Sequence, residues 1–285
     1  MEKKIYNYLA QTINFYIMDN LNLYNDDCIN VMQGMIRDGI KVDLTVTSPP
    51  YDNLRSYEGD IVWNFDKFKE VADKLYEVTA DGGVVIWVVN DQVRKGSESG
   101  TSFKQALYFK EIGFNLHDTM IYQKANYIPL THNRYEQAFE YMFCFTKGKP
   151  KTFNPIMIPC KNAGKVESYG SERRTLLDRN QAMRSPDGKT FMTTKDTKYH
   201  PNIFVYTLGG QRSGHPAAFP DKLAEDQIMT WSNEGDLVFD PFMGSGTTGK
   251  MAILNNRRFI GTEIVKDYYD ISVNRISKVL DEAKQ

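Results

Sequence analysis

A short apolar segment, residues 237–239, runs directly into a glycine-rich loop and then into a stretch with helical character. The loop carries Gly244, Gly246 and Gly249 in the spacing G-x-G-x-x-G, where missing Cβ atoms let the backbone approach a ligand closely. The first turn of the following helix offers unpaired N–H groups to the same ligand. A strand, a glycine turn and a helix in this order indicate an α/β fold with a ligand at the carboxyl edge of its sheet.

Three ligands fit this loop. A nicotinamide dinucleotide would place its ribose on Glu263, which ends the next apolar segment 19 residues after Gly244. A phosphate-binding loop fits residues 244–250 as G-x-x-x-x-G-K, but Met251 stands where that motif needs a hydroxyl for Mg²⁺. S-adenosylmethionine would place its amino-acid part on Asp240 and the glycine turn, and its ribose on Glu263.

A second apolar segment, residues 42–47, ends in the sequence Ser48-Pro49-Pro50-Tyr51. The two prolines fix φ near −65° and donate no N–H, so this loop is stiff and rich in acceptors. The Ser48 hydroxyl and the loop carbonyls suit an exocyclic amine, and the ring of Tyr51 offers a face on which a base can stack. A simple Pro-Pro turn that closes a strand is the alternative.

Together, the two loops resemble those of the amino-methylating DNA methyltransferases, which methylate cytosine N4 or adenine N6. The catalytic motif of that family, (D/N/S)-P-P-(Y/F), is matched by residues 48–51, and its cofactor motif, D-P-F-x-G-S-G-T-T, is matched at every position by residues 240–248. The catalytic motif comes first, which is the order of the family's β class. The resemblance implies a Rossmann-like, S-adenosylmethionine-dependent methyltransferase fold in circularly permuted order, with a mostly parallel sheet and helices on both faces.

The resemblance also implies a role for each residue of the site. The catalytic residues would be Ser48, Pro49, Pro50 and Tyr51. The cofactor would contact Asp27, Thr47, His215, Phe219, Asp240, Pro241, Phe242, Gly244, Ser245, Gly246, Thr247 and Glu263. Residues 215–220 are similar to the segment that precedes the cofactor motif in the β class. The match around Asp27 is a short acidic motif that an ordinary surface turn would also produce.

Residues 151–212 lie between the two motif-bearing parts and carry six Lys and five Arg against two Glu and three Asp, a net charge of +6 in a chain of net charge −1. Such local polarity suits a surface that faces phosphates. We expect residues 1–150 and 213–285 to form the catalytic and cofactor-binding domain, with residues 151–212 as an inserted, basic target-recognition region. A solvated insertion with ordinary surface lysines is the alternative. The candidate DNA-binding residues are Arg173, Arg174, Arg179 and Arg184.

Strands and helices are expected to alternate along the rest of the chain. Asn64 can cap a helix whose apolar residues recur at helical spacing and which residues 81–83 would end. A buried strand over residues 84–89, a helix near 103–112, and strands over 115–122 and 141–146 follow. After the glycine loop we expect a helix over residues 247–254, a strand over 259–263 and an amphipathic helix over 267–284.

Composition fits this interpretation. Hydrophobic residues make up 41% of the chain, no apolar stretch reaches the ~18 residues of a membrane helix, and we expect a cytoplasmic protein. The three cysteines show no metal-ligand spacing, so no metal is expected. DNA is the expected partner. A homodimer and a cognate restriction endonuclease are left open.

The function predicted from the sequence is site-specific transfer of a methyl group from S-adenosylmethionine to cytosine N4 in DNA, after base flipping. Serine at the first motif position is mostly associated with cytosine in this family, and adenine N6 is the alternative. An NAD-dependent oxidoreductase would account for the glycine loop and Glu263 but not for residues 48–51. A non-catalytic nucleic-acid-binding module would account for the basic segment but not for two ligand loops.

Overall fold

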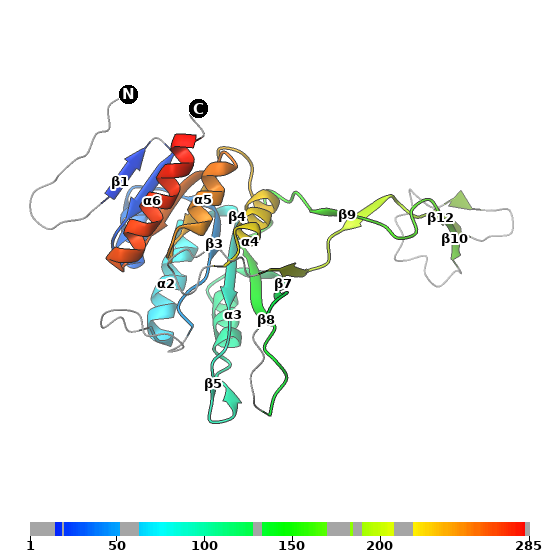
Figure 1. The fold of residues 1–285 in the computed structure, drawn as a ribbon, viewed down its shortest axis with the longest axis horizontal. Helices are drawn as coiled ribbons and strands as arrows, with labels where there is room; N and C mark the ends of the chain where they lie inside the picture. Colours follow the sequence, from blue (N-terminus) through cyan, green and yellow to red (C-terminus); the bar gives the residue numbers. More distant parts are fainter. Residues whose placement is uncertain are drawn as a thin grey trace, which may run out of the picture. The chain divides into compact units, whose positions relative to one another are not determined.

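The computed structural model describes residues 15–18, 20–51, 63–127, 133–169, 183–184, 190–207 and 219–282. The chain divides into two compact units, one of residues 1–154 with 202–285 and one of residues 155–201. The larger unit, whose helices and strands are coloured along the chain in Figure 1, is built on a sheet. This sheet has nine strands in the order β1-β2-β16-β15-β3-β4-β8-β7-β14. Its strands are β1 (Phe15–Met18), β2 (Leu21–Tyr24), β3 (Val42–Thr47), β4 (Thr79–Val89), β7 (Asn115–Lys124), β8 (Phe139–Thr146), β14 (Ile203–Tyr206), β15 (Leu237–Asp240) and β16 (Arg258–Thr262).

Most neighbours in this sheet run parallel. The parallel pairs are β2 with β16, β16 with β15, β15 with β3, β3 with β4, and β7 with β14. The antiparallel pairs are the β1–β2 hairpin at one edge, β4 with β8, and the β7–β8 hairpin. A further short hairpin, β5 (Val93–Arg94) with β6 (Ser97–Glu98), extends from the carboxyl end of β4. The expected mostly parallel sheet is therefore confirmed.

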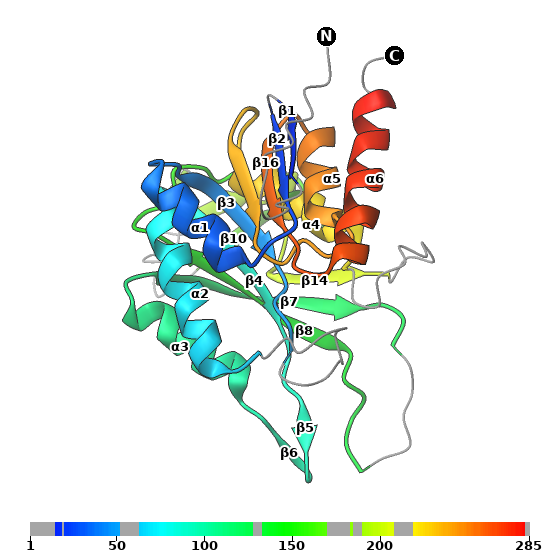
Figure 2. The ribbon, with the colours of Figure 1, turned by 90° about the vertical axis from the view of Figure 1, so that its left-hand side faces the viewer.

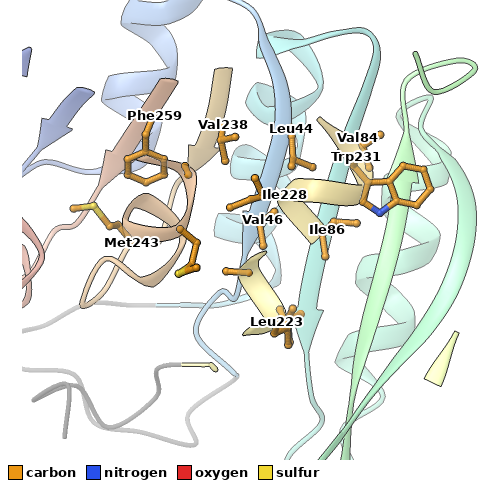
Figure 3. Packing of buried hydrophobic residues seen from close by; sticks show 14 of the residues in the cluster. Leu44, Val46, Val84, Ile86, Leu223, Ile228, Trp231, Val238, Met243 and Phe259 are labelled. Atoms are coloured by element: carbon orange, nitrogen blue, oxygen red, sulfur yellow. The ribbon is translucent and has the colours of Figure 1, made fainter. Parts of the chain in front are cut away.

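Helices cover both faces of the sheet, as expected. One face carries α1 (Cys28–Arg37), α2 (Phe65–Val78) and α3 (Thr101–Glu111), and the other carries α4 (Asp221–Trp231), α5 (Thr247–Leu254) and α6 (Lys266–Glu282) (Figure 2). The α4–α6 face packs Leu223, Ile228 and Trp231 of α4 against the side chains of β3 and β4 (Figure 3). Each face therefore has its own hydrophobic core, as in other sheets that are covered on both sides.

The strand order places both motif loops at one point of the sheet. β15 pairs with β3 in parallel, with Val238 opposite Leu44. From β15 the chain passes through α5 to β16 on one side, and from β3 it passes through α2 to β4 on the other. The two connections diverge between β15 and β3, which makes the carboxyl ends of these strands a topological switch point, where open α/β sheets bind their ligands.

Helix α2 begins as predicted and ends earlier. The Asn64 side chain accepts a hydrogen bond from Lys67 N. The expected end at residues 81–83 is wrong, because the helix stops at Val78, where the Thr79 hydroxyl donates to Leu75 O. Thr79 already belongs to β4, so residues 81–83 lie inside that strand. A Cβ at Gly83 would lie 2.8 Å from Ala80 O. The glycine therefore allows a close backbone approach within β4 and does not end the helix.

The other expected elements of the larger unit are present. α5 has the expected bounds, and α3 is followed by Gly113 at φ 115°. Strands β7 and β8 each extend two residues beyond the expected ones, which brings Lys124 and Glu140 into the sheet. None of the helices in the described part of the chain is long and apolar enough to cross a membrane.

The smaller unit consists of short antiparallel strands. β9 (Met157–Pro159) pairs with β13 (Thr197–Tyr199), and β12 (Thr190–Thr193) pairs with β10 (Val166–Tyr169) and β11 (Met183–Arg184). Bonds from Cys160 N to Asp196 O and from Gly164 N to Thr194 O continue the β9–β13 pairing. Four lysines of this unit are exposed, namely Lys161, Lys165, Lys195 and Lys198.

Candidate active site

A buried hydrogen bond joins the two motif loops. Thr47, the last residue of β3, donates from Oγ1 to Asp240 Oδ1 over 2.6 Å, although the two residues are 193 positions apart. The same oxygen accepts from Phe242 N at 3.0 Å, which shapes the turn after β15. Thr248 Oγ1, at the start of α5, donates to Val46 O at 3.1 Å. The glycine loop is thereby tied to the strand that carries the Ser48 loop.

Asp240 is a carboxylate enclosed by protein, with 2% of its surface exposed. Burial raises its pKa to about 6, while the hydrogen bonds from Thr47 and Phe242 N act in the opposite direction. These donors are neutral and do not cancel the charge of the ionised form. The position therefore favours a ligand that brings a positive charge.

Glu263 holds the glycine loop from the neighbouring strand. Its Oε2 accepts from Gly244 N and its Oε1 from Val265 N, both at 2.8 Å. Burial raises the pKa of Glu263, the backbone bonds lower it, and the nearby charge of Asp240 raises it further. Each oxygen of a carboxylate has two acceptor positions, so Glu263 can hold the loop and still accept from a ligand hydroxyl.

The glycines of the loop meet two different demands. Gly246 precedes α5 with φ at 80°, a conformation that other residues adopt only with strain. Gly249 lies in the first turn of α5, and a Cβ there would be 2.5 Å from Phe259 Cε1. The third glycine of the motif thus lets α5 pack directly against β16.

The Ser48 loop is connected to two charged side chains. Ser48 Oγ donates to Tyr51 Oη at 2.9 Å, and Tyr51 Oη donates to Glu140 Oε2 at 2.7 Å. Lys124 Nζ lies 2.7 Å from Glu140 Oε1. Glu140 and Lys124 come from the start of β8 and the end of β7, and both are largely buried. The Ser48 hydroxyl therefore belongs to a chain of hydrogen bonds that ends in an ion pair.

A comparison with protein families assigns the chain. A family model for N6- and N4-type enzymes, described as DNA methylase, matches residues 42–274. This chain belongs to that family. It is an S-adenosylmethionine-dependent, amino-methylating DNA methyltransferase, which confirms the predicted enzyme class, cofactor and DNA substrate.

Curated relatives cover most of the methyltransferase. The orphan methyltransferase M.BamHII of Bacillus amyloliquefaciens is 52% identical over 84% of this chain and 90% of its own length. The DNA adenine methyltransferase YhdJ of Escherichia coli (strain K12) is 28% identical over 82% of this chain and 76% of its own.

Solved structures show the same fold. The cytosine-N4-specific PvuII DNA methyltransferase has a TM-score of 0.65 at 20% identity and covers 92% of this chain and 91% of its own. The M1.HpyAVI-SAM complex has a TM-score of 0.60 at 24% identity and covers 90% and 99%. The predicted Rossmann-like methyltransferase fold is thus confirmed.

The residues at the switch point of the methyltransferase fit S-adenosylmethionine. Asp240 is the last residue of β15, and Glu263 directly follows the neighbouring strand β16; both carboxylates are buried, and burial raises the pKa of both. S-adenosylmethionine carries positive charge on its sulfonium and ammonium groups, and its ammonium and ribose hydroxyls are hydrogen-bond donors. Two buried carboxylates need such charges and donors as partners. The backbone N–H of Gly244, which donates to Glu263, lies beside them.

Several other predicted cofactor residues have protein partners in the methyltransferase. Asp27 caps α1 by accepting from Ile29 N and pairs with Lys67 at 3.1 Å. The rings of Phe242 and Trp63 pack edge to face, with centroids 5.2 Å apart. Phe219 packs against the α4–α6 core, and Thr247 is buried at the start of α5. These contacts leave the cofactor roles of the four residues as predictions.

Other predicted residues fall outside what the structure describes. His215, Arg173, Arg174 and Arg179 lie beyond the described residues. Arg184 belongs to β11, where only the backbone is described. Their roles in the methyltransferase remain predictions as well.

Three side chains at the site were missed in the sequence. Glu140 precedes the strand that was expected from residue 141, and Lys124 follows the one expected up to residue 122. Arg275 of α6 donates from Nη1 to Ser245 O at 2.7 Å and to Ser245 Oγ at 2.8 Å. In the sequence, Arg275 is one charge among many on an amphipathic helix. The one available signal was the alternation of side chains along the two strands, which places Lys124 on the same face as Tyr122 and Glu140 on the same face as Met142. That pattern could have indicated that Lys124 and Glu140 form a polar pair.

Within the described part of the methyltransferase, the potential metal ligands are dispersed and the cysteines are free thiols. Within the described ranges, no three His, Cys, Asp or Glu side chains gather as metal ligands would. Cys28, Cys144 and Cys160 are free thiols, and the first two are buried. Burial raises the pKa of the Cys28 and Cys144 thiols well above the ordinary value, which keeps both protonated and unreactive.

Proposed function

We propose that this methyltransferase modifies the exocyclic N4 amine of cytosine, at a specific DNA sequence, after flipping the base out of the duplex. The carrying observation is the Ser48 hydroxyl, which follows β3 next to the Thr47–Asp240 bond and therefore beside the cofactor loop. Serine at the first position of the motif is mostly associated with cytosine in this family. Ser48, Pro49, Pro50 and Tyr51 are the proposed catalytic residues.

The exocyclic amine of a base is a poor nucleophile because its lone pair is delocalised into the ring. Ser48 Oγ and the Pro49 carbonyl can accept its two N–H bonds and hold the nitrogen out of the ring plane. Bound S-adenosylmethionine supplies an electrophilic methyl group on its sulfonium. Transfer then depends on positioning and electrostatics, which the two loops at adjacent strand ends provide. Flipping the base out of the duplex costs on the order of a few kcal/mol, and stacking on Tyr51 offsets part of this cost.

For the cofactor we propose contacts along the switch point. Asp240 and the glycine loop would hold the amino-acid part, and Glu263 would accept from the ribose hydroxyls. Their buried, negatively charged positions support this assignment. The further proposed contacts are Asp27, Thr47, His215, Phe219, Pro241, Phe242, Gly244, Ser245, Gly246 and Thr247.

We propose that residues 151–212 recognise the target sequence, with Arg173, Arg174, Arg179 and Arg184 as DNA contacts. The net charge of +6 in this segment and the exposed lysines at 161, 165, 195 and 198 support a surface for phosphates. Replacing all four lysines with Gln should weaken DNA binding and flatten its dependence on salt, as measured by fluorescence anisotropy. An unchanged salt dependence would assign the lysines to ordinary surface.

The test of the reaction uses the full chain, plasmid DNA and labelled S-adenosylmethionine, followed by digestion to nucleosides and mass spectrometry. We expect N4-methylcytosine, and no transfer by Ser48→Ala. Ser277→Ala on α6 is the matched control and should keep full activity. Recovery of N6-methyladenine alone would overturn the base assignment in favour of adenine, the base named for YhdJ. Methylation-sensitive sequencing of host DNA would then give the target sequence.

We propose that the enzyme is cytoplasmic. We also propose that it acts without a paired endonuclease, because the 52% identical relative is named an orphan methyltransferase. Other relatives are named Type II methyltransferases, such as M.BglII of Bacillus subtilis. Cell extracts that cleave unmodified plasmid, but not plasmid modified by this enzyme, would show a cognate endonuclease and contradict the proposal. Sedimentation at several concentrations would test for a homodimer.

A further inference from the structure

We propose that Glu140 is a positioning residue that sets the direction of the hydrogen bonds through Tyr51 and thereby makes Ser48 a pure acceptor for the target amine. This inference rests on the proposed function, in which Ser48 accepts an N–H of the flipped base. It adds residues outside the motif, Glu140 and Lys124, to the machinery that serves the reaction.

The chain of bonds begins at the ion pair. An ionised carboxylate has no hydrogen to donate, so Glu140 can only accept. Its Oε1 faces Lys124 Nζ at 2.7 Å and its Oε2 faces Tyr51 Oη at 2.7 Å. The side chains of Glu140 and Lys124 are 13% and 21% exposed, so water competes little for either oxygen. Lys124 thus holds the carboxylate in place with one oxygen directed at Tyr51.

Each hydroxyl along the chain has one hydrogen. Tyr51 gives its hydrogen to Glu140 and can therefore only accept from Ser48. Ser48 in turn gives its hydrogen to Tyr51 at 2.9 Å. The hydrogen of Ser48 is committed, and what its oxygen offers to any further group is lone pairs.

This commitment matters because a serine hydroxyl can act either as a donor or as an acceptor. Left to rotate, Ser48 could present its hydrogen to the target amine, whose N–H groups need an acceptor. Members of the family with Asp at this position have a permanent acceptor. In this chain the negative charge sits on Glu140, two hydrogen bonds away, and Tyr51 transmits its effect. The family pattern also allows Phe at the position of Tyr51, so the relay is a property of this chain's residues and not of the motif.

Two substitutions test the relay, one by removing a hydrogen bond and the other by reversing the direction of the bonds. Tyr51→Phe keeps the stacking ring and removes the link. Glu140→Gln should reverse it, because Lys124 keeps the amide oxygen and turns the amide NH₂ toward Tyr51, which then donates to Ser48. For both variants we expect single-turnover methyl transfer to slow by about 10- to 100-fold, the range for a lost hydrogen bond to a charged group. Dissociation constants for DNA and for cofactor should stay within about twofold, since neither contact is removed.

A double variant separates direction from structure. In the Glu140→Gln background, Lys124→Met releases the amide oxygen, which can then face Tyr51 and accept again. The double variant should be faster than Glu140→Gln alone. A purely structural ion pair would make the double variant equal or slower, and that result overturns the proposal. Wild-type transfer rates in Tyr51→Phe overturn it as well.

The controls use a matched pair elsewhere in the fold. Tyr108 Oη of α3 donates to Asp73 Oδ1 of α2 at 2.9 Å, far along the chain from either loop. Tyr108→Phe and Asp73→Asn should leave transfer unchanged, and thermal unfolding of every variant should confirm folding. Ser48→Ala reports on the proposed function itself. Loss of transfer in Ser48→Ala with full transfer in both relay variants would reject only the relay, whereas full transfer in Ser48→Ala would reject the site.

Discussion

Thr47 Oγ1 donates a 2.6 Å hydrogen bond to Asp240 Oδ1 and so connects the last residues of two neighbouring strands. Both residues are buried, and each directly precedes one of the two loops of the site. The bond therefore sets the spacing between the loop assigned to the target amine and the loop assigned to the methyl donor. Methyl transfer is sensitive to that spacing because it depends on the alignment of donor and acceptor.

Thr47→Val should weaken cofactor binding. The substitution keeps the shape of the side chain and removes a donor to a buried carboxylate, which costs ~1.5–3 kcal/mol, or about 10- to 100-fold in affinity. Calorimetric titration with S-adenosylmethionine measures the change.

Thr45→Val is the matched control on the same strand. Thr45 is fully buried, and its Oγ1 has no hydrogen-bond partner among the described residues. Removing an unpaired buried hydroxyl should leave the free energy of unfolding unchanged or raise it. Equal loss of cofactor affinity in both valine variants would contradict the assigned role of the Thr47–Asp240 bond.

Asp240 should give cofactor binding a pH dependence. Burial raises its pKa from 3.8 to about 6, and a cationic ligand prefers the ionised form. Affinity for S-adenosylmethionine should therefore rise as the pH increases through about 6. Asp240→Asn should bind more weakly and lose most of this dependence, in titrations at pH values from about 5 to 8.

The same carboxyl should affect stability with the opposite trend. Because the folded state holds the proton more tightly than the unfolded chain, the contribution of Asp240 to stability is complete below about pH 4 and is lost as the pH rises to about 6. As the pH rises across this interval, the Tm of the unsubstituted protein should fall relative to the Tm of Asp240→Asn. A difference that stays constant with pH would contradict the raised pKa.

Gly249→Ala should destabilise the fold. Its Cβ would lie 2.5 Å from Phe259 Cε1 and 2.7 Å from Ile276 Cδ1, so α5 would have to move away from β16. Overpacking of this kind lowers the free energy of unfolding by ~1–3 kcal/mol. Gly34→Ala in α1 is the control, because its nearest neighbour is Arg37 Nη2 at 3.9 Å and a helix gains ~0.5–1 kcal/mol from the change. Urea unfolding should show opposite signs for the two variants.

Arg275→Met should loosen the glycine loop. The guanidinium donates to both oxygens of Ser245 and lies 3.5 Å from Asp221 Oδ1, so it holds the loop to α6 and α4. Amides of residues 244–246 should exchange faster with deuterated water, and cofactor affinity should fall by about 3- to 10-fold. Lys278→Met removes the same charge from the exposed side of α6 and should change neither measurement.

Local features were predicted well because they depend on neighbouring residues. Asn64 caps α2 as its side chain predicts, and α5 starts directly after Gly246. The end of α2 was wrong, since the Thr79 hydroxyl ends the helix before the glycines are reached. Two competing local signals, a threonine and a glycine pair, could not be ranked without the strand that begins at Thr79.

The site was predicted in part for the same reason. Residues 48–51 and 240–248 carry their chemistry in consecutive positions, so motif and spacing reveal them. Glu140 and Arg275 act through contacts with residues 89 and 30 positions away, and Lys124 acts through Glu140, 16 positions away on the next strand; no spacing rule exists for such contacts. Thr47 is predicted to contact the cofactor, and the structure adds that its hydroxyl donates to Asp240.

By itself the sequence determined two stiff or glycine-rich loops, the strands before them and the family to which they belong, because backbone restrictions of Pro and Gly act within a few residues. Only the tertiary structure decided that β3 and β15 are neighbours, and that a carboxylate on β8 reaches Tyr51. Strand order depends on burying both faces of the whole sheet at once, and no local pattern encodes it.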